Sequence, residues 1–98
     1  MHDARELESY IRRKFAEHVG LSEAELFSED LTLAALISRS PKMTNSVDLM
    51  EAFARTSNGL RKDYGLRVRL PALSLDTPVS KVLDVFLHEV LNPERKSA

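Results

Sequence analysis

The segment from residue 79 to residue 91 restricts the fold more than any other part of the chain. Its apolar side chains recur at intervals of three and four residues, the spacing that places them along one side of an α-helix. They are Val79, Val82, Leu83, Phe86, Leu87, Val90 and Leu91. Thr77 and Pro78 precede the segment as a cap and a first-turn proline, and Asn92-Pro93 follows it. Such a helix has to bury its apolar side against other elements.

Two further segments have the same helical spacing. Residues 4–19 repeat an apolar side chain at every fourth position, with Asp3 and Glu6 as a capping box and Gly20 as the end. Residues 46–63 form the second segment, which Gly65 ends. Its apolar stripe consists of Leu49, Met50, Phe53, Ala54 and Leu60. We expect the shared core to include Leu49, Phe53, Leu83 and Phe86.

The connections between these segments have weaker patterns. Ser22 and Glu25 indicate the cap of one short turn, and an apolar run, LTLAALI, follows at 31–37. The alternation at 66–70 is too short for a strand, and Pro71 permits a single helical turn at 72–75. We therefore predict an all-α fold, a small four-helix bundle with three main helices, one short helix and a long first loop.

Composition excludes several classes of protein. The 98 residues contain no linker, so we expect one domain over 1–98 with a polar tail at about 92–98. Lys and Arg number 14 and Asp and Glu 15, a balance that argues against binding nucleic acid or a membrane. The chain has no cysteine, which excludes disulfides, Cys-ligated metals and a thiol nucleophile. The sequence has no signal peptide and no long apolar run, so the expected location is the cytoplasm.

The sequence also lacks the patterns of catalysis. His2, His18 and His88 are far apart and have no metal-ligand spacing. There is no GxSxG motif for a nucleophilic serine, and the three glycines form no phosphate-binding loop. We expect neither a metal site nor an enzyme.

The basic run at 61–69, RKDYGLRVR, is the one indication of nucleic-acid binding. Tyr64 within it could stack on a base. The simpler interpretation is a helix end carrying cations that suit the helix dipole, followed by a solvated loop.

The most informative residues are TNSVDLMEAFA at 44–54. Asn45 or Thr44 caps the helix, which places Ser46 in its first turn. A serine there faces solvent at the positive end of the helix dipole. Its hydroxyl is accessible to an enzyme that delivers a phosphoryl group, and the helix terminus tolerates the resulting negative charge. On the local pattern alone, the three polar residues are simply a capping cluster.

Taken together, this arrangement resembles the acyl carrier protein family, including the carrier domains of polyketide and nonribosomal peptide synthases. The resemblance covers most of the chain. The family's Asp-Ser-Leu motif is represented by Asn45-Ser46-Val47, followed by Asp48, Leu49, Met50 and Glu51. A second match is YGLRVRLPALSLDTPVSKVLDVF, which is similar to the family's Leu-Pro stretch and the Asp-x-Pro that opens its last helix.

The resemblance implies a covalent 4′-phosphopantetheine arm on Ser46, transferred from coenzyme A by a phosphopantetheinyl transferase. The arm's thiol would hold an acyl or aminoacyl cargo as a thioester. It further implies that the chain is a monomer. The residues that recognise its partners would be Asn45, Val47, Asp48, Met50 and Glu51. The other partners would be a cargo-loading ligase or acyltransferase and downstream biosynthetic enzymes.

The chain departs from the family pattern at two positions, where Asn45 replaces Asp and Val47 replaces Leu. The first departure keeps open a second hypothesis, an unmodified docking or regulatory subunit with the carrier fold. A small helical nucleic-acid-binding domain is the third. The loop at 28–45 is longer and more apolar than usual for the family, which indicates an extra turn over the core or a partner-specific surface.

Overall fold

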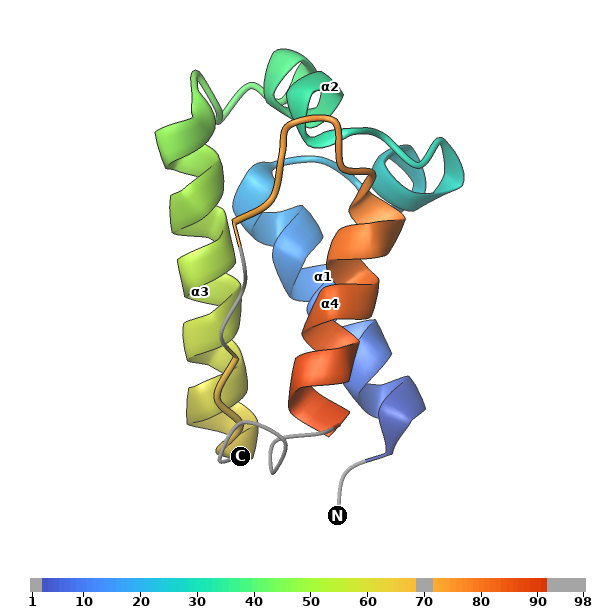
Figure 1. The fold of residues 1–98 in the computed structure, drawn as a ribbon, viewed down its shortest axis with the longest axis vertical. Coiled ribbons are helices and arrows are strands. Elements are labelled where there is room, and N and C mark those ends of the chain that lie inside the picture. Colours follow the sequence, from blue (N-terminus) through green and yellow to red (C-terminus); the bar gives the residue numbers. More distant parts are fainter. Residues whose placement is uncertain (1–2, 69–71, 92–98) are drawn as a thin grey trace.

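The three amphipathic segments form three long helices that lie side by side in a small helical bundle (Figure 1). These are α1 (Ala4–Val19), α3 (Ser46–Tyr64) and α4 (Val79–Leu91). The computed structural model describes residues 3–68 and 72–91. His2, Arg69, Pro71, Asn92-Pro93 and the tail at 92–98 lie outside the described residues. Within the described residues there is no strand, only an isolated bridge between Thr32 and Pro78.

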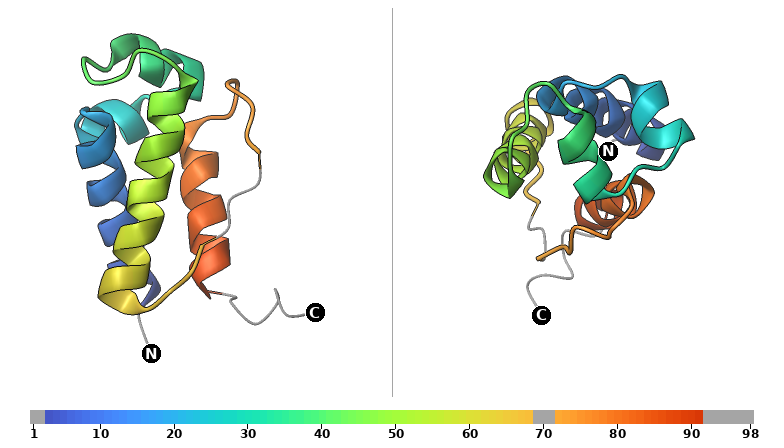
Figure 2. Two further views of the ribbon diagram at one scale, coloured as in Figure 1. Left: turned by 90° about the vertical axis from the view of Figure 1, so that its left-hand side faces the viewer. Right: turned by 90° about the horizontal axis from the view of Figure 1, so that it is seen from above.

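The long helices do not alternate in direction. α3 and α4 run the same way and α1 runs opposite to both (Figure 1). Seen from above, the three helices occupy the corners of a triangle, and α2 (Leu33–Arg39) lies over one end (Figure 2). Because α3 and α4 are parallel, the connection after Gly65 has to return along the bundle before α4 begins. That return brings residues 72–75 close to the start of α3.

The first connection contains two short helices. η1, a π-helix over Ala24–Ser28, follows the predicted cap, in which Ser22 Oγ accepts from Glu25 N at 3.1 Å. α2 begins after Thr32, whose Oγ1 accepts from Ala35 N at 3.2 Å. The apolar run at 31–37 therefore forms a helical turn over the end of the core, which is one of the two outcomes expected for it.

The predicted short helix at 72–75 is wrong. Residues 72–74 have no regular structure and residues 75–76 form a turn. Their backbone bonds instead to α2, because Ala34 N donates to Leu75 O and Leu33 N to Thr77 O, each at 2.9 Å. One local backbone bond remains, from Thr77 N to Ser74 O at 3.1 Å, and the bonds to α2 hold the segment in place of a helical turn.

Caps at the helix ends agree with the sequence in part. Asp3 caps α1 by accepting from Arg5 N at 3.1 Å, but Glu6 does not complete a capping box. Its Oε2 accepts instead from Tyr64 Oη, at 3.1 Å. For α4, the side chain of Asp30 takes the capping role expected of Thr77, accepting from Ser80 N at 2.9 Å and from Ser80 Oγ at 3.0 Å.

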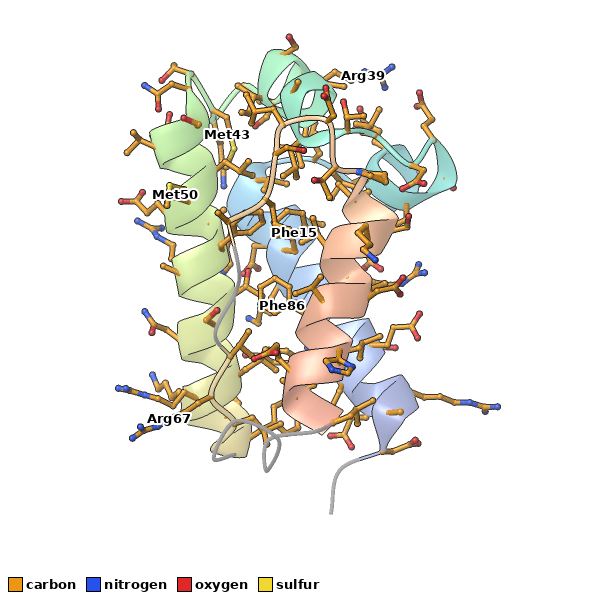
Figure 3. The ribbon with its side chains drawn as sticks, in the orientation of Figure 1. Phe15, Arg39, Met43, Met50, Arg67 and Phe86 are labelled. Atoms are coloured by element: carbon orange, nitrogen blue, oxygen red, sulfur yellow. The ribbon has the colours of Figure 1, made fainter. Side chains whose placement is uncertain are left out.

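The core lies between α1, α3 and α4 and is closed by α2 and η1. Phe86 is fully buried and Leu49 and Leu83 are buried, as predicted. The fourth predicted core residue, Phe53, is half-buried, with its ring stacked on Phe15 at 5.5 Å between centroids. Figure 3 shows Phe15 and Phe86 inside the bundle.

The predicted widening of the α3 stripe is wrong. Met50 and Ala54 are exposed, and the buried side of α3 consists of Leu49, Ala52, Thr56 and Leu60. The stripe therefore widens in the other direction around the helix, toward α1. Met50 is left on the outer surface.

Candidate functional site

Ser46 is the first residue of α3, and its side chain is exposed. Of the two predicted cap residues, Asn45 and Thr44, Asn45 caps the helix, since its Oδ1 accepts from Val47 N at 2.9 Å and from Asp48 N at 3.2 Å. These bonds occupy two backbone donors in the first turn of α3 and fix the backbone that carries Ser46. The serine hydroxyl is thus presented at a rigid, positively polarised helix end.

The carboxylate of Asp48 holds the preceding loop against α3. Its Oδ2 accepts from Thr44 N at 2.9 Å and from Thr44 Oγ1 at 2.8 Å. Both hydrogen bonds favour the charged carboxylate and lower the pKa of Asp48. Asp48 therefore has a structural role beside any part in recognition.

The predicted recognition residues do not form one surface. Val47 is 69% exposed and Met50 67% exposed, and Met50 lies on the outer side of α3 (Figure 3). Asp48 and Glu51 instead line a crevice between α3 and the end of α1, and Glu51 pairs with Arg55 at 3.5 Å. The apolar and the acidic residues near Ser46 consequently face different sides of α3.

An apolar groove opens beside Ser46, between the first half of α3, α2 and residues 72–75. Its volume is about 660 Å³. It is lined by Leu33, Ser46, Leu49, Met50, Phe53, Ala72, Leu73, Ser74 and Leu75. Its far wall is the segment 72–75. The hydrogen bonds from Ala34 N to Leu75 O and from Leu33 N to Thr77 O hold this segment against α2.

The sequence did not predict this groove. Its far wall is the segment 72–75, which we predicted to be helical. The available signal was the apolar sequence Leu73-Ser-Leu75, which follows Pro71 and lies before the last helix.

The crevice on the opposite side of α3 has mixed charge. Its volume is about 430 Å³, and its lining includes Glu17, His18, Lys42 and Arg55 as well as Asp48 and Glu51. Partial burial lowers the pKa of His18, which favours the neutral imidazole. Among the described residues, no group of three or more His, Asp or Glu side chains is arranged to hold a metal ion.

Tyr64 is not positioned as a stacking platform for a base. Its hydroxyl donates to Glu6, and its ring packs edge-on against Tyr10 with 5.1 Å between centroids. Two arginines of the basic run, Arg61 and Arg67, line a small separate groove. The third, Arg69, lies outside the described residues.

Comparison of the chain with protein-family models, with curated proteins and with solved structures finds no match. Among the helices of the described residues, none combines the length and the apolar character required to cross a membrane.

Proposed function

We propose that the chain is a carrier protein that holds an acyl or aminoacyl cargo on a 4′-phosphopantetheine arm attached to Ser46. The observation that carries this proposal is the exposed hydroxyl of Ser46 at the capped start of α3, on the rim of an apolar groove. Under this proposal the chain is not an enzyme. It works in the cytoplasm as a handle that raises the local concentration of its cargo at successive active sites.

Attachment would join Ser46 Oγ to the phosphorus of coenzyme A that bears the pantetheine. The pyrophosphate bond of coenzyme A breaks, adenosine 3′,5′-bisphosphate leaves, and a base of the transferase takes the serine proton. The new phosphodiester then carries one negative charge at the N-terminus of α3, where the helix dipole favours an anion. The exposure of Ser46 supports the proposal because the hydroxyl has to enter the transferase's active site.

The groove beside Ser46 supports an apolar cargo. Its volume of about 660 Å³ falls within the range of about 300–1,000 Å³ typical of small-molecule sites. Seven of its nine lining residues, all but Ser46 and Ser74, are apolar. The arm's terminal thiol would carry the cargo as a thioester, and the groove would shelter apolar parts of that cargo from water.

The proposed partners are the transferase, a cargo-loading ligase or acyltransferase, and downstream biosynthetic enzymes. Asn45, Val47 and Met50 are exposed around Ser46 and would meet each enzyme that approaches it. Large exposed apolar side chains are typical of contact surfaces. Asp48 and Glu51 would contribute from the neighbouring side of α3.

The same exposed residues favour one alternative, a docking subunit that is never modified. Val47 and Met50 would contact a partner of such a subunit equally well. Asn45 stands where the family has an Asp, so the carboxylate beside the serine is absent. The two functions differ only in whether Ser46 carries the arm. A mass measurement therefore separates them.

The test is incubation of the protein with coenzyme A, Mg²⁺ and a transferase from its native host, followed by mass spectrometry. We expect one phosphopantetheine per chain. Trypsin would place it on residues 43–55, cut after Lys42 and Arg55, in which Ser46 is the one serine. Ser46→Ala should abolish the addition. The matched control is Ser74→Ala, which removes another exposed hydroxyl from the same groove and should leave loading unchanged.

A wild-type chain that stays unmodified would overturn the carrier proposal in favour of the docking subunit. Modification of Ser46→Ala at the wild-type rate would show that another residue is the attachment point.

A further inference from the structure

A cationic groove lies at the far end of α3 from Ser46. It has a volume of about 250 Å³ and is lined by Ser57, Asn58, Arg61, Arg67 and Val68. Arg61 and Arg67 are exposed, and neither forms an ion pair with another residue in the described part of the chain. The nearest carboxylate in sequence, Asp63, accepts a hydrogen bond from Tyr10 at 2.6 Å. This groove therefore presents positive charge that its own walls do not neutralise.

The cationic groove and the apolar residues beside Ser46 lie on one side of α3. Val47, Met50, Ala54 and Arg61 follow the spacing of three, four and seven residues that keeps side chains on one side of a helix. Figure 3 shows Met50 near one end of α3 and Arg67 near the other, both on the outer side. At 1.5 Å per residue, Arg61 is about 22 Å along α3 from Ser46.

The surroundings of the arginines favour a protein partner over nucleic acid. Tyr64, the aromatic residue of this run, contacts Glu6 and Tyr10. The chain as a whole has a formal net charge of -1, whereas nucleic-acid-binding domains are typically strongly basic. A few exposed arginines beside an apolar strip instead match a protein surface with carboxylates at the corresponding distance.

We propose that Arg61 and Arg67 dock carboxylates of the phosphopantetheinyl transferase that loads Ser46. Before loading, the reacting oxygen sits on α3 itself, so the transferase has to lie against this helix. Later enzymes meet a thiol at the end of an arm and have no such requirement. The transferase would thus contact Val47 and Met50 near its active site and hold Arg61, about 22 Å along α3, together with the neighbouring Arg67.

This inference rests on the proposed modification of Ser46 and adds a specific prediction to it. Charge pairs at the rim of an interface act mainly on association and weaken as salt screens them. Losing the arginines should therefore raise the KM for the carrier and leave kcat unchanged. The effect should shrink at high salt.

The test compares loading kinetics of the wild type with those of the double variant Arg61→Glu and Arg67→Glu. We expect kcat/KM to fall about tenfold or more at low ionic strength, through KM. The milder Arg61→Gln and Arg67→Gln pair should show a smaller change in the same direction and guards against a folding defect, which circular dichroism would detect. The matched control, Arg5→Glu with Lys81→Glu, makes the same change in charge on α1 and α4 and should leave KM unaltered.

Three results would overturn the proposal. The first is an unchanged KM for both arginine pairs while the wild type is loaded normally, which would leave the modification of Ser46 intact. The second is an equal loss in the control pair, which would reduce the effect to net charge. The third is tight binding of a labelled single-stranded oligonucleotide that both arginine pairs abolish, since this would assign the groove to nucleic acid. A wild type that is never loaded would instead refute the proposed function and this inference together.

Discussion

Gly59 of α3 lies directly against Tyr10 of α1, and substituting it gives a sharp test of how the two helices pack. Tyr10 is 5% exposed and its hydroxyl donates to Asp63 Oδ2 at 2.6 Å. A Cβ atom added at Gly59 would lie 2.5 Å from that hydroxyl oxygen, and 3.6 Å from the next nearest ring atom, Cζ. Gly59→Ala therefore requires the phenol to move, which breaks its hydrogen bond to Asp63.

Two opposing effects set the magnitude. A hydrogen bond to a charged group contributes about 1.5–3 kcal/mol, whereas alanine is about 1 kcal/mol better than glycine inside a helix. Gly59→Ala should therefore destabilise the wild type by about 0.5–2 kcal/mol. In a Tyr10→Phe background the obstructing oxygen is absent, so the same change should stabilise the protein by about 1 kcal/mol.

The assay is denaturant unfolding of the wild type, the two single variants and the double variant, from which the coupling energy follows. We expect a coupling of about 1.5–3 kcal/mol between residues 10 and 59. Gly65→Ala is the matched control, since Gly65 has a φ of 70° and open space around its Cβ position. It should destabilise both backgrounds equally through backbone strain. The same sign and size for Gly59→Ala in both backgrounds would refute this account of the helix contact.

Other parts of the structure give further predictions. Phe86→Ala should lower the unfolding free energy by about 3–5 kcal/mol in a denaturant titration, and Phe53→Ala by less because Phe53 is half-buried; the reverse order would contradict the packing. Asn45→Ala should cost about 1 kcal/mol in the same titration, whereas Asn45→Asp should change stability by a few tenths at most and load Ser46 at least as fast, which a mass time course checks. Burial and Asp63 raise the pKa of Tyr10 from 10.0 to about 12, so the folded state keeps a proton that the unfolded state loses. The stability advantage of the wild type over Tyr10→Phe should therefore be complete below pH 10 and disappear as the pH rises toward 12; unfolding curves that keep a constant difference would contradict this.

The sequence predicted the long helices well because their signals are local. An apolar side chain at every fourth position and two end residues, Asp3 and Gly20, define α1. The structure gives the same bounds. Asn45 marks the start of α3 for the same reason, since a cap needs only the next three residues. The exposed position of Ser46 follows directly from that cap.

The remaining features depend on contacts between distant residues. The segment 72–75 bonds to α2 about 40 residues earlier, so its local propensity for a helical turn did not decide its structure. The run 31–37 is apolar almost throughout, which hides the helical period of α2. The spacing of Met50 is that of a core residue. It is exposed because α3 packs on α1 through the side of the helix that carries Ala52 and Thr56. The groove beside Ser46 could not be predicted because the segment 72–75, α2 and Met50 all line it.

Under the proposed function, Ser46 carries the arm in the living cell. The most direct measurement is mass spectrometry of the protein purified from its native cells without added coenzyme A or transferase. We expect the tryptic peptide 43–55 to be heavier by one phosphopantetheine, alone or with its cargo, on Ser46. A peptide 43–55 recovered entirely at its unmodified mass, from cells that modify other carriers, would contradict it.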